Sequence, residues 1–129
     1  MAKFSAISRE RLETCHPDLQ RLFQEVVKHF DCLILEGHRD KTHQDLYYSQ
    51  GKSKLKWPHG EHNKLPSMAC DVMPYPVDFK NIKRLYMFVG FVLGTARQMG
   101  IKVRSGYDWD GDTDINDQQF HDGPHWELI

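Results

Sequence analysis

The chain has 129 residues, and its 17 basic and 18 acidic side chains give a formal net charge of −1. This length predicts a single domain over residues 1–129, because two domains of ordinary size need a longer chain. The balanced charge predicts no nucleic-acid partner and no stable association with a membrane, and a 40% share of hydrophobic residues excludes wholesale disorder.

The first residues and the cysteines bear on the cellular compartment. Residues 1–6 lack the apolar stretch of a secretory signal, and no run approaches the roughly 20 apolar residues that span a bilayer. The three cysteines are widely spaced and odd in number, which argues against a disulfide framework and against a cysteine zinc site. We therefore expect reduced thiols and export only with outside help.

The first half of the chain predicts two helices, a strand and a third helix. Ser8 can cap a short first helix, and apolar residues then recur at helical spacing from Leu19 to Phe30. Cys32 to Glu36 is typical of a short buried strand. A polar helix is expected from about Asp40 to Gln50, and Gly51 ends it.

The second half predicts a long loop, a strong helix and three strands. In chain order we expect a loop over 52–67, a strand over 68–73, a helix over 79–99 stopped by Gly100, a strand over 101–105, an acidic turn-rich stretch over 108–122 and a last strand over 124–129. This order predicts an α+β domain with a small, mostly antiparallel sheet packed against helices.

Histidines and carboxylates are arranged in two motifs. The chain has eight histidines but lacks the helical HExxH pair of many zinc proteases. Instead, His62 precedes the strand that carries Asp71, and the C-terminal segment supplies Asp122 and His125.

These motifs resemble a family of zinc peptidases. It includes D-Ala-D-Ala carboxypeptidases, vancomycin-resistance dipeptidases and phage L-alanyl-D-glutamate endopeptidases, and is related in fold to the hedgehog signalling domain. The resemblance covers most of the chain and implies this hedgehog-like peptidase fold. It rests on Gly37-His38-Arg39, Gln44 and Gly51, the segment His62 to Asp71 with the Pro74-Tyr75-Pro76 tail, and Asp122-Gly-Pro-His125-Trp-Glu127.

The resemblance implies a role for five of these residues. His62, Asp71 and His125 would hold one Zn²⁺, and two imidazoles with one carboxylate suit a catalytic zinc that keeps an open position. Asp122 would be the general base, with a turn aspartate as the alternative. Arg39 would contact substrate or polarise the scissile carbonyl, with a structural salt bridge as the alternative.

Five further side chains are candidates for contact with a metal ligand or with substrate. Glu127 lies two residues beyond His125, so the two share a face of a strand, although a paired carboxylate at the core edge is the alternative. The remaining candidates, each of which also has a structural explanation, are His59, His121, Gln44 and Trp126.

Two charged segments are open to two interpretations. The alternating Asp108, Asp110, Asp112 and Asp114 indicate a regulatory Ca²⁺ site like one in similar phage endopeptidases, or a solvated acidic turn without a terminal glutamate ligand. The cluster of Lys52, Lys54 and Lys56 is either a solvated face or a contact to an anionic wall polymer.

Together these features predict a monomeric phage or prophage endolysin that cleaves the peptidoglycan stem peptide between L-alanine and D-glutamate. It would accumulate in the host cytoplasm and act in the periplasm after a holin opens the membrane. The alternatives are a D-Ala-D-Ala carboxypeptidase and a non-catalytic binding module stabilised by zinc, and a base at Asp122 argues against the module.

Overall fold

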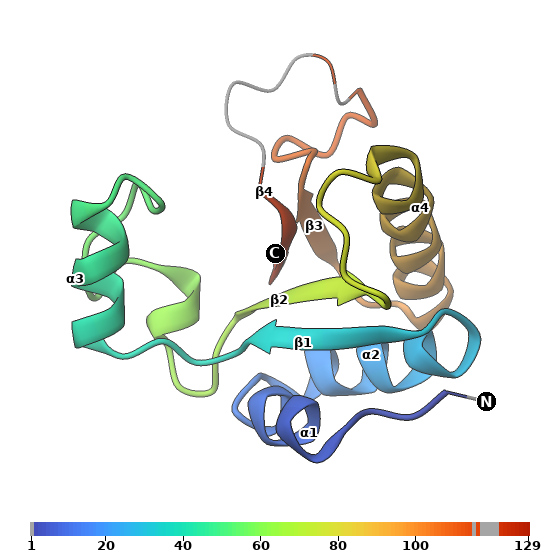
Figure 1. Ribbon diagram of the computed structural model, residues 1–129, viewed down its shortest axis with the longest axis horizontal. Helices are drawn as coiled ribbons and strands as arrows, with labels where there is room; N and C mark the ends of the chain where they lie inside the picture. Colours follow the sequence, from blue (N-terminus) through green and yellow to red (C-terminus); the bar gives the residue numbers. More distant parts are fainter. Residues whose placement is uncertain (1, 115, 117–121) are drawn as a thin grey trace.

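The elements of the computed structural model follow the predicted order closely (Figure 1). The structure describes residues 2–114, 116 and 122–129, with Asp122 described by its backbone only. The elements are α1 (Ala6–Glu13), α2 (Pro17–His29), β1 (Cys32–Glu36), α3 (Lys41–Ser49), the 3-10 helix η1 (Glu61–Asn63), β2 (Ala69–Pro74), α4 (Ile82–Met99), β3 (Val103–Gly106) and β4 (Asp122–Leu128). The expected α+β domain is confirmed.

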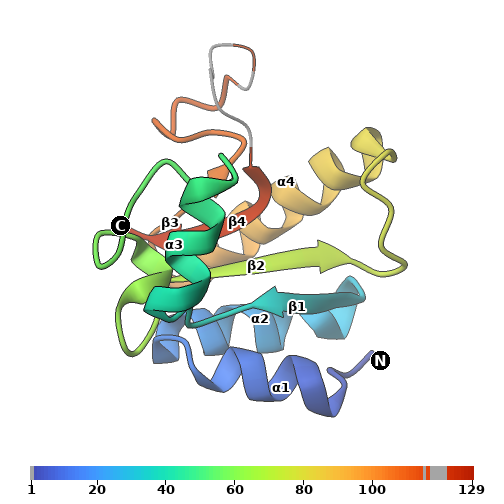
Figure 2. The same cartoon turned by 60° about the vertical axis from the view of Figure 1, so that its left-hand side comes forward.

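The sheet has the strand order β1-β2-β4-β3, and each pair of neighbours is antiparallel. Helix α1 packs against β1, α2 packs against α4, and α4 packs against β2 and β3. Helix α3 stands to one side of the sheet, beyond the end of β1 (Figures 1 and 2). The sheet therefore has one face covered by helices, and the other face is left for polar side chains.

Strand β4 separates these two faces because successive side chains point to opposite sides. Trp126 is fully buried and meets Phe23 of α2 edge to face, at a ring distance of 6.2 Å. His125 and Glu127 lie on the opposite face of the strand. Trp126 thus belongs to the core, and the expectation that it contacts substrate is wrong.

The N-cap of helix α1 lies three residues earlier than the expected cap, Ser8. Ser5 is the N-cap, and its hydroxyl accepts a hydrogen bond from the backbone N–H of Ser8 at 3.2 Å. Ser8 is buried inside the helix, where its hydroxyl accepts from the N–H of Ile34 at 3.1 Å. Both serines are good caps by residue type, and contact with β1 decides between them.

Helix α4 begins at Ile82, since Asn81 caps it by accepting from the N–H of Arg84. The predicted start at Phe79 is therefore too early. Gly100 ends the helix in the left-handed conformation, at φ +71°, as expected. Among the described residues, no helix combines the length and apolar character that a bilayer span requires.

The turn into β4 is closely packed. The Cα of Asp122 pairs with Gly106 of β3, which extends the strand two residues beyond its predicted start at Pro124. A Cβ on Gly123 would lie 2.4 Å from the ring of Tyr107, so only glycine fits beneath this ring. The contact fixes the backbone two residues before His125.

Candidate active site

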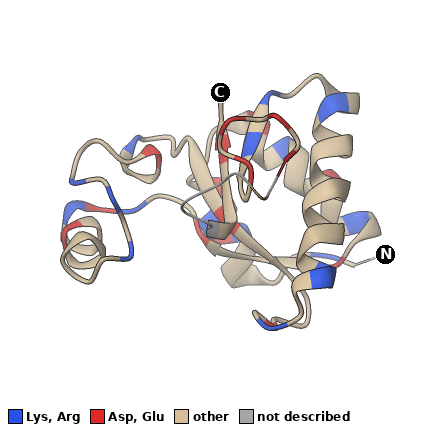
Figure 3. Cartoon of the chain, turned by 90° about the horizontal axis from the view of Figure 1, so that it is seen from above, with Lys and Arg blue, Asp and Glu red and all other residues tan. Residues whose placement is uncertain are grey.

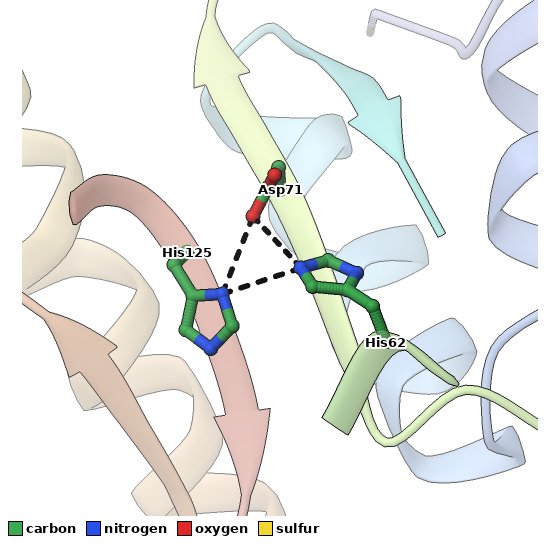
Figure 4. A group of neighbouring side chains, drawn as sticks. All are labelled: His62, Asp71 and His125. Atoms are coloured by element: carbon green, nitrogen blue, oxygen red, sulfur yellow. Dashed lines mark hydrogen bonds and ion pairs between the residues drawn. The ribbon is translucent and has the colours of Figure 1, made fainter. Parts of the chain in front are cut away.

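His62 from η1, Asp71 from β2 and His125 from β4 converge on one point (Figure 4). The Nε2 atom of His62 lies 3.3 Å from Nδ1 of His125 and 3.2 Å from Oδ1 of Asp71. The third side of the triangle, from Nδ1 of His125 to Oδ1 of Asp71, is 3.5 Å. The three residues that the resemblance names as metal ligands thus lie together.

Sheet register and one short turn produce this convergence. Asp71 and His125 are direct partners in the β2–β4 ladder, which brings their side chains together on one face. His62 is held beside β2 because the carbonyl of Glu61 accepts from the N–H of Met68 at 3.1 Å. The carbonyl of His62 also accepts from the N–H of Arg39 at 2.8 Å.

Hydrogen bonds on the outer side of each imidazole set its orientation. Nδ1 of His62 lies 2.8 Å from the carbonyl oxygen of Gly37, and Nε2 of His125 lies 2.7 Å from Oε1 of Glu127. Because these oxygens accept, the ring nitrogen beside each one carries the proton. The unprotonated nitrogens then face Asp71, which is the arrangement that metal-binding histidines adopt.

The cluster has the spacing and chemistry of a cation site. Oδ1 of Asp71 is buried without a hydrogen-bond partner, and it faces two nitrogen lone pairs. Ligand atoms about 2.0–2.1 Å from a tetrahedral Zn²⁺ are separated by about 3.3 Å. The observed sides of 3.2 to 3.5 Å fit this spacing, so the residues present fit a zinc ion.

The charge state of Asp71 suits the same role. Burial alone would raise the pKa of this carboxyl group. The charges and hydrogen bonds that His62 and His125 offer when protonated outweigh burial and hold the pKa well below its ordinary value. The carboxylate is therefore ionised, and protons on the imidazoles compete with a metal ion for the site.

Glu127 connects His125 to β3 and to the acidic loop. Its Oε2 atom accepts from Nη2 of Arg104 at 2.8 Å, and Nη1 of Arg104 donates to the carbonyl of Trp109 at 3.2 Å. Burial would raise the pKa of Glu127, but the bonds from His125 and Arg104 outweigh it and lower this pKa. The ring of Trp109 lies 5.1 Å from that of His125. These contacts make Glu127 an oriented, ionised acceptor for His125.

Arg39 lies beside the cluster and is already paired. Its guanidinium donates to Glu36, at 2.7 Å from Nε, and to Oε1 of Gln44 at 3.0 Å, and it stacks on the ring of Tyr47. One nitrogen lies 3.9 Å from Oδ2 of Asp71. The geometry is compatible with the salt bridge and with a substrate contact, because Arg39 also lines the cavity at the cluster.

Gln44 is fully buried and joins three segments. Its Oε1 atom accepts from Arg39 and from Asn63, and its Nε2 atom donates to the hydroxyl of Ser53 and the carbonyl of Leu55. Asn63 follows His62 directly, so Gln44 links the segment that carries His62 to the loop after α3. The expected contact of Gln44 with a metal ligand or with substrate stays a prediction.

The remaining residues predicted at this site are His59, His121 and Asp122. His59 is exposed and is absent from the lining of the cavity at the cluster. His121 lies outside the described residues, and the side chain of Asp122 is not described. Arg104 and Asn63 are contacts that sequence reasoning missed, because only the strand register and the η1 turn bring them to the site.

A second cluster lies in the acidic loop, visible as a run of red segments in Figure 3. Carboxylate oxygens of Asp108, Asp110 and Asp112 lie within 4.8 Å of one another. Asp108 is buried, and its Oδ1 atom has no hydrogen-bond partner. In the described part of the loop, Asp114 lies outside this cluster and accepts from the N–H of Asn116.

Comparison with known proteins identifies the family. The model of the phage L-alanyl-D-glutamate peptidases matches residues 1–129. The chain belongs to this family. It is 27% identical to the L-alanyl-D-glutamate peptidase of Escherichia phage T5, over 98% of both chains.

A solved structure agrees with this assignment. The crystal structure of the Serratia marcescens L-Ala D-Glu endopeptidase ChiX matches 98% of the chain and 90% of its own length, with a TM-score of 0.75 and 26% identity. The chain is accordingly a peptidase of a family that acts on peptidoglycan. This outcome argues against the non-catalytic module.

The link between Glu127 and His125 gives a prediction about metal affinity. Glu127→Ala removes the acceptor that orients the imidazole and should weaken Zn²⁺ binding by about 10- to 100-fold. Competition with a chromophoric chelator measures the affinity. Glu127→Gln keeps an acceptor oxygen and should lose less of the Zn²⁺ affinity. Glu61→Ala removes another carboxylate of the same cavity and should bind Zn²⁺ as tightly as wild type does. Equal affinities for all four proteins would contradict the role of Glu127.

Proposed function

We propose that this protein is a zinc-dependent endolysin that hydrolyses the bond between L-alanine and D-glutamate in the peptidoglycan stem peptide. One observation carries the proposal. In a chain of this family, two oriented imidazoles and an unpartnered carboxylate oxygen converge at tetrahedral spacing. Three protein ligands would leave a tetrahedral zinc ion one position for the reaction.

His62, Asp71 and His125 would hold the metal. Zinc supplies Lewis acidity, which polarises the scissile carbonyl and makes water a better nucleophile at neutral pH. The residues around it keep the ligands in place: Gly37 and Glu127 accept from the two imidazoles and fix their unprotonated nitrogens. The charge of Asp71 offsets part of the charge of the ion.

Asp122 is our proposed general base. It would take a proton from the attacking water and pass it to the leaving amine. The resemblance motivates this assignment, and two backbone facts support it. Asp122 lies in the same strand as His125, and its backbone is set by pairing with Gly106.

Arg39 is our proposed electrophilic contact to the substrate. A guanidinium held by Glu36, Gln44 and the ring of Tyr47 cannot reorient freely, so its position is set before substrate arrives. A positioned cation stabilises the negative charge that develops on a carbonyl oxygen during attack. Its place in the lining of the cavity beside His62 and His125 supports such a contact.

We also propose that the acidic loop binds one regulatory Ca²⁺. The buried Oδ1 atom of Asp108 has no partner, and carboxylates of Asp110 and Asp112 lie beside it. Burial raises the pKa of Asp108, and the neighbouring carboxyl groups of Asp110 and Asp112 act in the same direction, although the N–H of Thr113 opposes them. A hard cation with oxygen ligands would relieve this unfavourable grouping of carboxyl groups.

The site of action is the cell wall, and we propose how the enzyme reaches it. A phage protein made in the host cytoplasm must pass the inner membrane before it meets peptidoglycan. Release through a holin would deliver it to the periplasm. Membership of a phage peptidase family supports this route.

Digestion of purified Gram-negative peptidoglycan tests the reaction. New N-terminal D-glutamate is expected in mass spectra, lost on treatment with a zinc chelator and restored by zinc. Released D-alanine would instead identify a D-Ala-D-Ala carboxypeptidase. An enzyme that cleaves equally well after complete metal removal would contradict the zinc assignment.

Two variants separate the base from the metal ligands. Asp122→Ala should reduce kcat by about 10²- to 10⁴-fold while the protein keeps one zinc per chain, because general-base catalysis contributes that much. His125→Ala should lose both activity and tightly bound zinc. Normal cleavage by the Asp122 variant would refute its assignment as the base.

The calcium proposal has its own matched pair of variants. Asp108→Asn removes the buried charge and should abolish the heat of Ca²⁺ binding in calorimetry and the rise in Tm on Ca²⁺ addition. Asp114→Asn changes a carboxylate of the same loop outside the cluster and should keep both signals. If wild type binds no Ca²⁺, or if the two variants behave alike, the proposed site is wrong.

A further inference from the structure

The metal cluster opens onto a cavity of about 260 Å³. His62, His125 and Glu127 line it together with residues 52–55 of the loop after α3. This loop is far from β4 in sequence, yet it shares the cavity with the proposed ligands. A substrate bound at the cluster would therefore lie close to the loop.

Buried hydrogen bonds hold the loop in this place. Gln44 donates to the hydroxyl of Ser53 at 2.9 Å and to the carbonyl of Leu55 at 2.5 Å. The same side chain accepts from Asn63, next to His62. Because Gln44 is fully buried, these bonds fix the loop backbone relative to the cluster. Lys52 and Lys54 flank Ser53 and both line the cavity.

The charges around the cavity favour an anionic ligand at the loop. Arg39 is paired with Glu36, and Arg104 is paired with Glu127, so each of these two cations already has a carboxylate partner. Lys52 is exposed and forms no ion pair among the residues that the structure describes. It lies 5.9 Å from the centre of the Tyr47 ring.

The remaining acid of the lining, Glu61, is paired with a different lysine. Glu61 is bonded to Lys64 through both of its oxygens, at 3.0 and 3.1 Å. Lys56, the third lysine of the segment, is absent from the lining and lies over the ring of Tyr48 at 5.0 Å. The loop therefore brings two basic side chains, those of Lys52 and Lys54, to the lining of the cavity that the cluster shares.

The proposed substrate carries a negative charge at a matching place. A glutamyl residue has two carboxyl groups and uses at most one of them in the bond to the next residue. At least one carboxylate thus stays free, within about 5 Å of the nitrogen of the scissile bond. A lysine ammonium binds such a carboxylate through charge-assisted hydrogen bonds.

We propose that Lys52 and Lys54 form a carboxylate-binding subsite, which recognises the free carboxylate of the residue that follows the scissile bond. The inference rests on the proposed function and deepens it, because it explains how a peptidase selects a glutamyl residue at this position. Gln44 acts as a positioning residue for the subsite. The two lysines contribute to substrate recognition and leave the metal centre unchanged.

A matched pair of synthetic stem peptides tests the proposal. One carries the free carboxylate, and the other carries a carboxamide of nearly the same shape at that position. Wild type should cleave the carboxylate peptide with a kcat/KM about tenfold higher than that for the carboxamide peptide. A tenfold difference is the size expected for a hydrogen bond between charged groups, and it should arise mainly from a lower KM. The preference should weaken as salt concentration rises.

Variants of the three lysines identify the groups responsible. The double variant Lys52→Ala, Lys54→Ala should cleave both peptides at the rate that wild type shows for the carboxamide. Lys56→Ala is the matched control and should keep the full preference, and Lys52→Arg with Lys54→Arg should keep most of it. Thermal unfolding and bound zinc per chain should be equal in all these proteins, since the changed side chains are exposed.

The outcomes separate this inference from the proposed function. If wild type cleaves neither peptide, the assigned scissile bond is wrong, and the subsite proposal is wrong as well. If wild type cleaves both peptides equally, the assignment of the scissile bond is kept and the subsite proposal is refuted. A preference that survives in the double variant would likewise refute the role of Lys52 and Lys54.

Discussion

The pairing of Asp71 with His125 across β2 and β4 is the constraint on which the site depends. In an antiparallel ladder, a shift of one residue moves every side chain to the other face of the sheet. Such a shift would turn His125 toward the helices and bring Trp126 to the cluster. Packing of Trp126 against Phe23 in the core therefore holds the register that brings the two proposed ligands together.

Around this pair, the folded protein orients the acceptor atoms of the proposed metal site. Gly37 and Glu127 orient the imidazoles, and Arg104 holds Glu127. Each contact comes from a different element, so ligand geometry is a property of the folded domain. Three converging acceptor atoms repel one another, and a bound cation would relieve this repulsion. We infer that metal binding and folding support each other.

Two loops extend from the cluster, and a polar side chain, Gln44 or Arg104, ties each of them to it. Gln44 connects residues 52–55 to Asn63, and Arg104 connects Trp109 of the acidic loop to Glu127. The loop after α3 presents lysines and the other presents carboxylates, so opposite charges lie at different places around one centre. This division would let one loop contact an anionic substrate while the other holds a cation.

The sequence by itself determined the order of helices and strands, since hydrophobic periodicity and glycine or proline stops are local signals. It also carried the family motifs, and hence His62, Asp71 and His125 as a set. Only the tertiary structure decided which face of β4 meets the helices, which removed Trp126 from the site and brought in Arg104. It also decided between Ser5 and Ser8 as the first helix cap. Contacts of this kind join residues distant in sequence, and no local pattern encodes them.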